Sequence, residues 1–332
     1  MREIVLDTET TGLDPLTGDR ILEIANPARL SVKDAQLVIE REDFLPFITP
    51  VSGVNTLLLA HPQVTLTQAV ISRLAEAGAM VVTIDGRYLP VAMTLPLQAH
   101  SLQTERLAAQ TTLKPVIRKR LWTQIVQAKI RAQGDLLKEL RGSDEGLIAT
   151  AARVRSGDPE NLEAQVARRY WGLIFADPKF RRGADPLESG PDQNRHLDYG
   201  YTVLRASVAR AVCAAGLHPS IGLRHHNRYD PFCLAADLME PFRPIIDRRV
   251  AAWIANNDPA GPLNAIPKKW LIEAVTMRYW VNREERALSD ILFRVAASLA
   301  SVMAGSEEKL DLPQALVPCQ DDSTSLPTGV CG

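Results

Sequence analysis

The hydrophobic periodicity of this chain changes once, near residue 100, and that change constrains the fold most strongly. From about residue 20 to 98 the chain is a series of short apolar runs, such as 36–40, bounded by turn-forming residues as strands are. From about Leu102 to Met303 apolar residues recur at helical spacing. The sequence therefore predicts an α+β protein, in which a small β-rich N-terminal domain (20–98) precedes a larger all-α domain (99–305).

Some elements of the first domain can be located from the residues that end them. Residues 65–77 have helical apolar spacing, and a glycine follows them directly. Two strand-like runs, 80–84 and 88–93, flank Asp85 and Gly86, a dipeptide typical of hairpin turns. We therefore expect one helix and, after it, a β-hairpin.

In the second domain, aspartate followed by proline marks the start of two helices. Asp158 is the expected N-cap, with proline at the first helical position, of a helix that carries Glu163. Asp230 precedes a proline in the same way, ahead of a segment that carries Glu240. Two prolines just beyond Glu240 are expected to kink or restart that helix.

Two carboxylates and an imidazole in this domain form a set of ligands that Mg²⁺ or Mn²⁺ accepts, with positions left for a phosphate substrate. They are Glu163, His225 and Glu240. Asp237 lies three residues before Glu240, so on a helix both carboxylates can face one site. A metal ion held there could polarise a phosphodiester.

Residue types alone leave structural alternatives open for each of these side chains. Glu163 could face solvent from its helix, which is the usual fate of an isolated glutamate. His225 and the adjacent His226 could be loop histidines that cap backbone groups. Asp237 could be a structural acceptor rather than part of a site.

Longer stretches of sequence accompany these residues. They read ILEIANPARLS at 21–31, HPQVTLT at 61–67 and HSLQTER at 100–106, with Pro-Phe-Arg-Pro directly after Glu240. Together they resemble the CRISPR-associated spacer integrases, most closely the compact type II forms, over about residues 20–300. The resemblance implies that Glu163, His225 (in a Gly-x-x-His motif) and Glu240 are the catalytic metal ligands. Asp237 and Arg243 are the auxiliary candidates, and Arg243 could either bind phosphate or brace Glu240.

The resemblance also implies the reaction and the partners. The 3′-hydroxyl of an incoming double-stranded DNA fragment would attack a phosphodiester of the CRISPR array, with Mg²⁺ or Mn²⁺ as cofactor. Two chains would form a homodimer, and two dimers would flank a small ferredoxin-like adaptation subunit. One departure is Asp198, where relatives often carry Asn. A catalytically inactive DNA-binding scaffold of the same complex is the alternative function.

The first 19 residues resemble only the first motif of the DEDD 3′→5′ proofreading exonucleases. Asp7 and Glu9 are two apart in a strand-like run, so both could face one pair of metal ions. No later exonuclease motif follows at a suitable distance. We therefore expect a leader (1–19) that is not a domain of its own, and a 3′→5′ exonuclease is the least favoured function.

A net charge of −1 does not indicate a nucleic-acid-binding protein, but the basic residues are unevenly distributed. Eight Lys or Arg fall between residues 114 and 141, against two acidic residues, and a second group follows Glu163. Such a run of charges usually forms a solvated helix face. Given the resemblance, contact with DNA phosphates becomes the favoured role for some of these residues. The candidate DNA-binding residues are Arg118, Lys119, Arg120, Lys129, Arg131, Arg168, Arg181 and Arg182.

Composition indicates where the protein is located and which segments are ordered. No apolar run approaches the roughly 20 residues of a membrane span, so no membrane association is expected. The four cysteines form no Cys-x-x-Cys pair and no secretory signal is present, which favours a cytoplasmic protein without zinc or disulfides. The tail 306–332 is expected to be disordered. Tyr170, Trp171, Tyr199 and Tyr201 are expected in the core rather than stacked on DNA.

Overall fold

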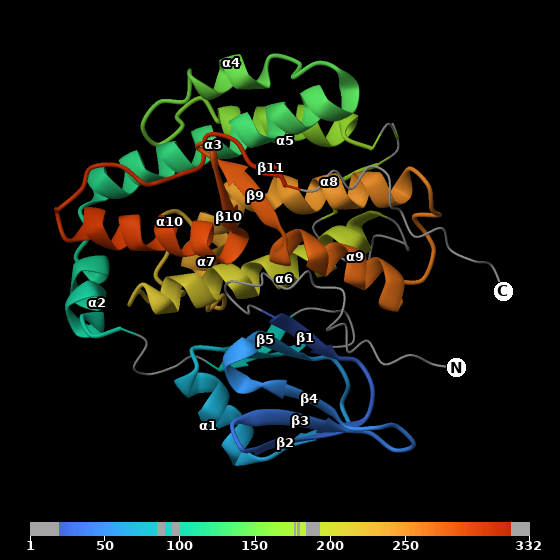
Figure 1. The fold of residues 1–332 in the computed structure, drawn as a ribbon. Helices are drawn as coiled ribbons and strands as arrows, with labels where there is room; N and C mark the ends of the chain where they lie inside the picture. The colour runs from blue at the N-terminus through green and yellow to red at the C-terminus, as the bar shows by residue number, and fades with distance from the viewer. Residues whose placement is uncertain are drawn as a thin grey trace.

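A computed structural model of the chain shows a strand-rich N-terminal part beneath a larger helical part (Figure 1). This order confirms the expected α+β fold class. Asp7 and Glu9 lie outside the described residues. The structure describes residues 20–84, 90–94, 100–175, 177, 180–183 and 193–319.

The N-terminal part contains two four-stranded sheets. The first has the order β1 (Arg20–Ile24), β5 (Val54–Leu59), β7 (Met80–Ile84) and β8 (Pro90–Thr94), with β8 antiparallel to its neighbour and the others parallel. The second has the order β4 (Phe47–Pro50), β3 (Gln36–Glu40), β2 (Ala28–Lys33) and β6 (Val64–Leu66). The short helix η1 (Val51–Gly53) and helix α1 (Gln68–Glu76) complete this part.

The first sheet is buried on both faces, because alternate residues of a strand point to opposite sides. In β1, Leu22 packs into the core shared with the second sheet and α1, while Ile21 packs into the core of the helical part. In β5, Leu57 packs into the core shared with the second sheet and α1, and Leu58 packs into the core of the helical part. One sheet therefore joins the two parts of the molecule.

The structure tests two local expectations in the N-terminal part. The strands on either side of Asp85 and Gly86 do pair antiparallel, although the turn itself is outside the described residues. The helix expected from residue 65 begins three residues later, at Gln68. The reason is that residues 64–66 form β6, which pairs parallel with β2.

The helical part is built around α6, which is buried over most of its length. The helices of this part are α2 (Gln103–Thr111), α3 (Pro115–Arg141), α4 (Leu147–Ala151), α5 (Leu162–Leu173), α6 (Gln193–Ala214), α7 (Cys233–Met239), η2 (Glu240–Phe242), α8 (Arg243–Ile254), α9 (Ala265–Thr276) and α10 (Leu288–Met303). α3 begins with proline at its first position, and its C-cap is Gly142, whose φ of 80° suits a glycine.

The helical part is not all-α, which corrects one expectation. Strands β9 (Arg278–Val281) and β10 (Glu284–Ala287) form a hairpin, and β11 (Val317–Pro318) adds to its other edge. The tail is likewise ordered as far as Cys319: Leu310 is buried, and the Cys319 amide donates to the Arg278 carbonyl. A polar composition did not prevent this segment from pairing with an available strand edge.

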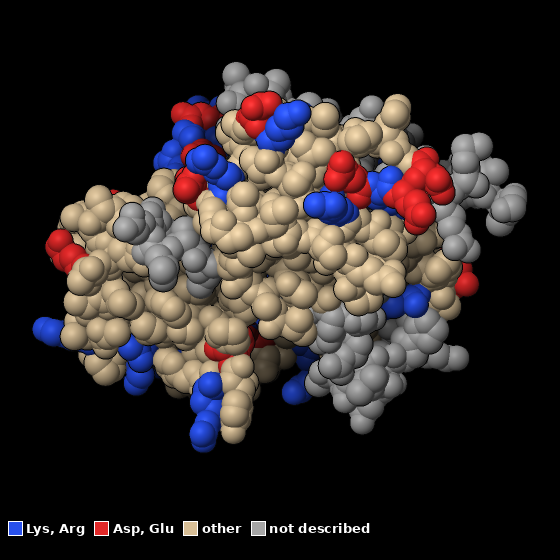
Figure 2. Space-filling view, turned by 90° about the horizontal axis from the view of Figure 1, so that it is seen from below, with Lys and Arg blue, Asp and Glu red and all other residues tan. Residues whose placement is uncertain are grey.

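Charged side chains are scattered over the face seen from below, which is the side of the N-terminal sheets (Figure 2). Lys and Arg there are interspersed with Asp and Glu, and no broad basic patch is visible on it among the described residues. In the described part of the chain, no helix combines the length and apolarity needed to cross a bilayer.

Candidate active site

Glu163 occupies the first turn of α5. The helix begins at Leu162 rather than at Pro159, so the expected start is three residues early. Asp158 nevertheless satisfies the helix terminus, since its carboxylate accepts hydrogen bonds from the amides of Leu162 (2.9 Å) and Glu163 (3.0 Å). This cap fixes the turn that carries Glu163.

Glu240 begins the single turn η2 between α7 and α8, so the expected interruption near Pro241 is confirmed. α7 itself starts at Cys233, later than the Asp230 pattern predicts, although Asp230 does accept a hydrogen bond from the amide of Phe232. The tight turn directs the buried Glu240 side chain toward α3.

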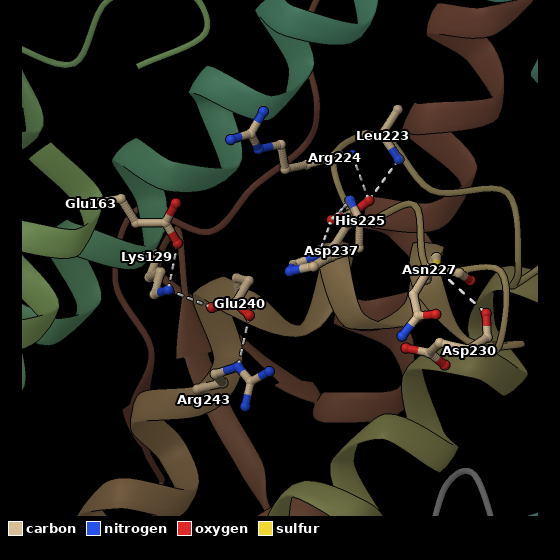
Figure 3. Close-up of polar contacts among 11 residues, drawn as sticks. Lys129, Glu163, Leu223, Arg224, His225, Asn227, Asp230, Asp237, Glu240 and Arg243 are labelled. Carbon is tan, nitrogen blue, oxygen red and sulfur yellow. Dashed lines mark hydrogen bonds and ion pairs between the residues drawn. The ribbon is translucent and has the colours of Figure 1, made fainter. Parts of the chain in front are cut away.

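Lys129, from the middle of α3, lies between the two glutamates (Figure 3). Its Nζ is 2.7 Å from Glu163 Oε1 and 2.7 Å from Glu240 Oε2. Arg243 holds the other oxygen of Glu240, with Nε 2.9 Å from Oε1. Two carboxylates and two cations therefore form one continuous, largely buried cluster.

These cations set the protonation of the site. Burial alone would raise the pKa of Glu240, but the charges of Arg243 and Lys129 outweigh it and lower that pKa to about 2. The same attraction outweighs the effect of burial on Lys129 and raises its pKa. Glu240 is therefore a carboxylate, and Lys129 an ammonium, at neutral pH.

His225 is oriented by Asp237. The fully buried Asp237 carboxylate accepts hydrogen bonds from the amides of Leu223, Arg224 and His225, and Oδ1 lies 2.6 Å from His225 Nδ1. The hydrogen bond to Asp237 raises the pKa of His225. Because Nδ1 is engaged, Nε2 is the ring nitrogen left to bind a ligand.

The fit of these residues to a metal ion can be tested on the buried oxygens. Among the described residues, no three His, Cys, Asp or Glu side chains are close enough to share a metal ion. Glu163 and Glu240 nevertheless meet at one cation, and His225 is close enough to Glu240 to lower its pKa. Buried Glu240 Oε2 faces the Lys129 ammonium but accepts no hydrogen bond of regular geometry. Such an oxygen suits a cation, so Glu163 and Glu240 are oxygen donors of the kind that Mg²⁺ or Mn²⁺ binds.

Comparison with known families matches residues 23–260 to the family described as "CRISPR associated protein Cas1". The chain belongs to the Cas1 family. It is 32% identical over 304 residues to the CRISPR-associated endonuclease Cas1 of Neisseria meningitidis serogroup C (strain 8013), covering 90% of this chain and 96% of that protein. A Cas1 endonuclease of Pyrobaculum aerophilum is 26% identical over 298 residues, covering 84% and 97%.

Solved structures confirm the Cas1 fold. A casposase bound to its integration product superposes with a TM-score of 0.72 at 20% identity, covering 89% of this chain and 92% of that one. A Cas1 protein from Thermotoga maritima superposes with a TM-score of 0.66 at 17% identity, covering 87% and 98%. The family model and the Neisseria relative confirm the expected family, and the roles of individual residues remain predictions.

Trp122 and Gly222 lie at this site, and the sequence predicted no role for either side chain position. Trp122, on α3, places its ring edge-on to that of His225, with centroids 5.9 Å apart and planes at 88°. A β-carbon at Gly222 would lie 2.4 Å from the His225 carbonyl oxygen, so only glycine fits the loop there. The seven-residue spacing of Trp122 and Lys129, two helical turns, was a signal that both face one site.

The candidate DNA-binding residues separate into distinct groups. Lys119, Arg120, Arg168 and Arg181 are exposed, and Arg118 and Arg131 are half-buried. Lys129 and Arg182 form ion pairs with carboxylates of the protein, and their predicted contact with DNA remains a prediction. Arg182 lies 2.6 Å from Asp198, and it also donates to Asn194.

Three of the four aromatic residues expected in the core are buried there, and Trp171 packs against the core while half-buried. The Tyr170 hydroxyl donates to Asp247 Oδ2 (2.7 Å), and the Tyr201 hydroxyl donates to Oδ1. The guanidinium of Arg243 lies 4.6 Å from the centre of the Tyr201 ring. This buried group therefore supports Arg243, and through it Glu240.

Proposed function

We propose that this chain is a metal-dependent DNA integrase that inserts spacer DNA into a CRISPR array by 3′-hydroxyl transesterification. Family membership and the endonuclease names of its relatives support a role in DNA cleavage and joining. The casposase with the same fold was solved with its integration product. The observation that carries the proposal is the meeting of Glu163 and Glu240 at a single cation position.

Glu163, Glu240 and Nε2 of His225 would hold Mg²⁺ or Mn²⁺. Bound there, the metal would stabilise the charge that develops on the phosphate and on the leaving 3′-oxygen. Asp237 keeps the His225 ring in the orientation that presents Nε2, and Arg243 keeps the Glu240 carboxylate ionised and fixed.

The attacking nucleophile is the 3′-hydroxyl of the incoming DNA, so no covalent protein–DNA intermediate is needed. A phosphodiester bond to the new 3′-oxygen forms as the bond to the old one breaks. Exposed basic residues on α3 and α5, such as Lys119, Arg120 and Arg168, would bind the backbone of the double-stranded fragment and of the array.

The proposed assembly is a homodimer that joins a small ferredoxin-like adaptation subunit and acts on DNA in the cytoplasm. Its support is a fold neighbour from a Cas6-RT-Cas1–Cas2 complex, which superposes with a TM-score of 0.69 at 18% identity. That match covers 89% of this chain and 36% of the longer one.

A strand-transfer assay tests the proposal. Short duplexes should join a plasmid carrying a repeat array in the presence of Mg²⁺ or Mn²⁺, and Glu163→Gln, His225→Ala or Glu240→Gln should each lower the yield at least about 100-fold. The control is Glu160→Gln, an exposed glutamate close to Glu163 in the chain, which should leave joining unchanged. Full activity in the three site variants would refute the metal site. DNA binding without joining by the wild-type protein would instead support the scaffold role.

A further inference from the structure

The Lys129 ammonium occupies the place between the carboxylates where the proposed function requires a metal ion. Its side chain is 13% exposed, and its polar contacts within the described residues are those to Glu163 and Glu240. Two negative charges on these glutamates are balanced by two positive ones, on Lys129 and Arg243. The cluster is therefore already neutral without a metal.

We propose that Lys129 is a built-in counter-ion, which holds Glu163 and Glu240 together in the metal-free protein and must be displaced when a divalent metal binds. The inference rests on the proposed metal site and adds a competitor to it. It predicts that metal affinity is set partly by how strongly this lysine holds the two carboxylates.

Displacement follows from the geometry at Glu240. Arg243 holds Oε1, and Lys129 lies 2.7 Å from Oε2, which is the buried oxygen without a regular hydrogen bond. A magnesium ion bound to Oε2 at about 2.1 Å would lie within about 5 Å of the ammonium. Two cations so close in a largely buried site repel each other strongly.

Lys129, rather than Arg243, is the cation that leaves. Arg243 is held by the Tyr201 ring in addition to Glu240, and its planar group is fixed. Lys129 has a flexible four-carbon stem, and Glu163, its second partner, is the more exposed of the two glutamates. Rotation of the stem moves the ammonium away without moving α3.

The test is a titration of the intact protein with Mn²⁺ alone, with free Mn²⁺ measured by electron paramagnetic resonance. Lys129→Met should bind Mn²⁺ about ten-fold more tightly than wild type, the size of effect seen when a neighbour of a metal ligand is changed. Lys138→Met, at an exposed lysine of the same helix, should bind like wild type. Glu240→Gln should bind much more weakly, which locates the site.

Thermal unfolding gives a second readout and guards against misfolding. Without metal, Lys129→Met should unfold at a lower temperature than wild type, because the two carboxylates lose the cation that they share. Mn²⁺ should raise its unfolding temperature by more than it raises that of wild type. Lys129→Gln, which keeps a polar group, should show both effects to a smaller degree.

The outcomes separate the two proposals. Equal or weaker Mn²⁺ binding in Lys129→Met and Lys129→Gln, with binding still lost in Glu240→Gln, would overturn displacement and leave the metal site standing. Absence of Mn²⁺ binding in wild type and in all variants would overturn the metal site and, with it, the role of Lys129.

Discussion

Asp237 shows how one buried carboxylate organises the loop that carries His225. It accepts three backbone amides and the Nδ1 hydrogen of His225, so the loop wraps around it. The chain can approach this closely because residue 222 has no side chain: a β-carbon there would be 2.4 Å from the His225 oxygen and 2.9 Å from Asp237 Oδ2. The glycine of the Gly-x-x-His motif is thus a packing requirement.

Gly222→Ala should therefore both destabilise the protein and lower activity. The added methyl forces the loop off Asp237, which should cost about 1–3 kcal/mol of unfolding free energy. His225 would lose its orientation, so strand transfer should fall at least about ten-fold. Denaturant unfolding and the joining assay measure the two effects.

The matched control is Gly172→Ala on α5, where a β-carbon would contact nothing within 4 Å. Alanine favours a helix over glycine, so this variant should be as stable as wild type or more so. If Gly222→Ala behaved like Gly172→Ala, the close packing of the loop on Asp237 would not matter in solution.

At the scale of elements, helices α5, α6 and α8 are joined at Asp247. Tyr170 comes from α5, Tyr201 from α6, and both hydroxyls donate to this carboxylate of α8. Burial raises the pKa of Asp247 to about 6, despite the opposing effect of the two tyrosine hydroxyls. The junction therefore holds a proton more tightly than an unfolded chain does.

This difference predicts a pH dependence of stability. Because the pKa of Asp247 is raised on folding, the protonated carboxyl contributes to the free energy of unfolding. This contribution is fully present below about pH 4 and is lost as pH rises through about 6. Asp247→Asn cannot titrate, so its stability relative to wild type should improve by up to about 3 kcal/mol between pH 4 and pH 7. Chemical denaturation of both proteins across this range measures the difference. Parallel curves would mean that Asp247 has an ordinary pKa in the folded protein.

Element boundaries show what the sequence could and could not predict locally. Asp158 was predicted to be the N-cap of α5, but Asn161 occupies that position and the helix begins three residues later than the Asp-Pro pattern suggests. The Asp158 carboxylate still accepts from the first helical amides, from the turn that precedes the helix. β6 is three residues long and exists because β2 offers a partner edge. Local patterns predict that an element exists, while pairing across the chain decides where it starts.

At the scale of the molecule, one buried ion pair connects the two parts. Glu23 of β1 lies 2.7 Å from Lys268 of α9 and accepts a hydrogen bond from the hydroxyl of Tyr199 on α6. Both charged side chains are almost fully buried. Because a buried charge without a partner is costly, this contact should resist separation of the first sheet from the helices.

Lys268→Met should leave Glu23 buried without its cation and cost about 3 kcal/mol of unfolding free energy. Adding Glu23→Gln should recover part of that loss, because the remaining group is neutral and can still accept from Tyr199. Equilibrium unfolding of the single and double variants measures both. A double variant no more stable than Lys268→Met would show that the charge itself is not the source of the cost.

The long-range arrangement was predictable only where recognisable sequence marked it. The motifs around Glu163, His225 and Glu240 predicted a common site, and the structure brings Glu163 and Glu240 to one cation although they are far apart in the chain. Lys129 was predicted only as one of the basic residues of a DNA surface. Its ion pairs with Glu163 and Glu240 could not be predicted, because they depend on how α3 packs against α5 and η2. Strand β11 escaped prediction for the same reason, since it is two residues long and pairs with β9 of a distant hairpin.

The central claim is that Glu163, His225 and Glu240 hold one metal ion, and crystals grown with Mn²⁺ test it most directly. Diffraction data collected at the manganese absorption edge should show a single anomalous peak about 2 Å from a carboxylate oxygen of Glu163, one of Glu240 and Nε2 of His225. Lys129 should have moved away from Glu240. No peak at this position, with Lys129 still between the two glutamates, would contradict the account.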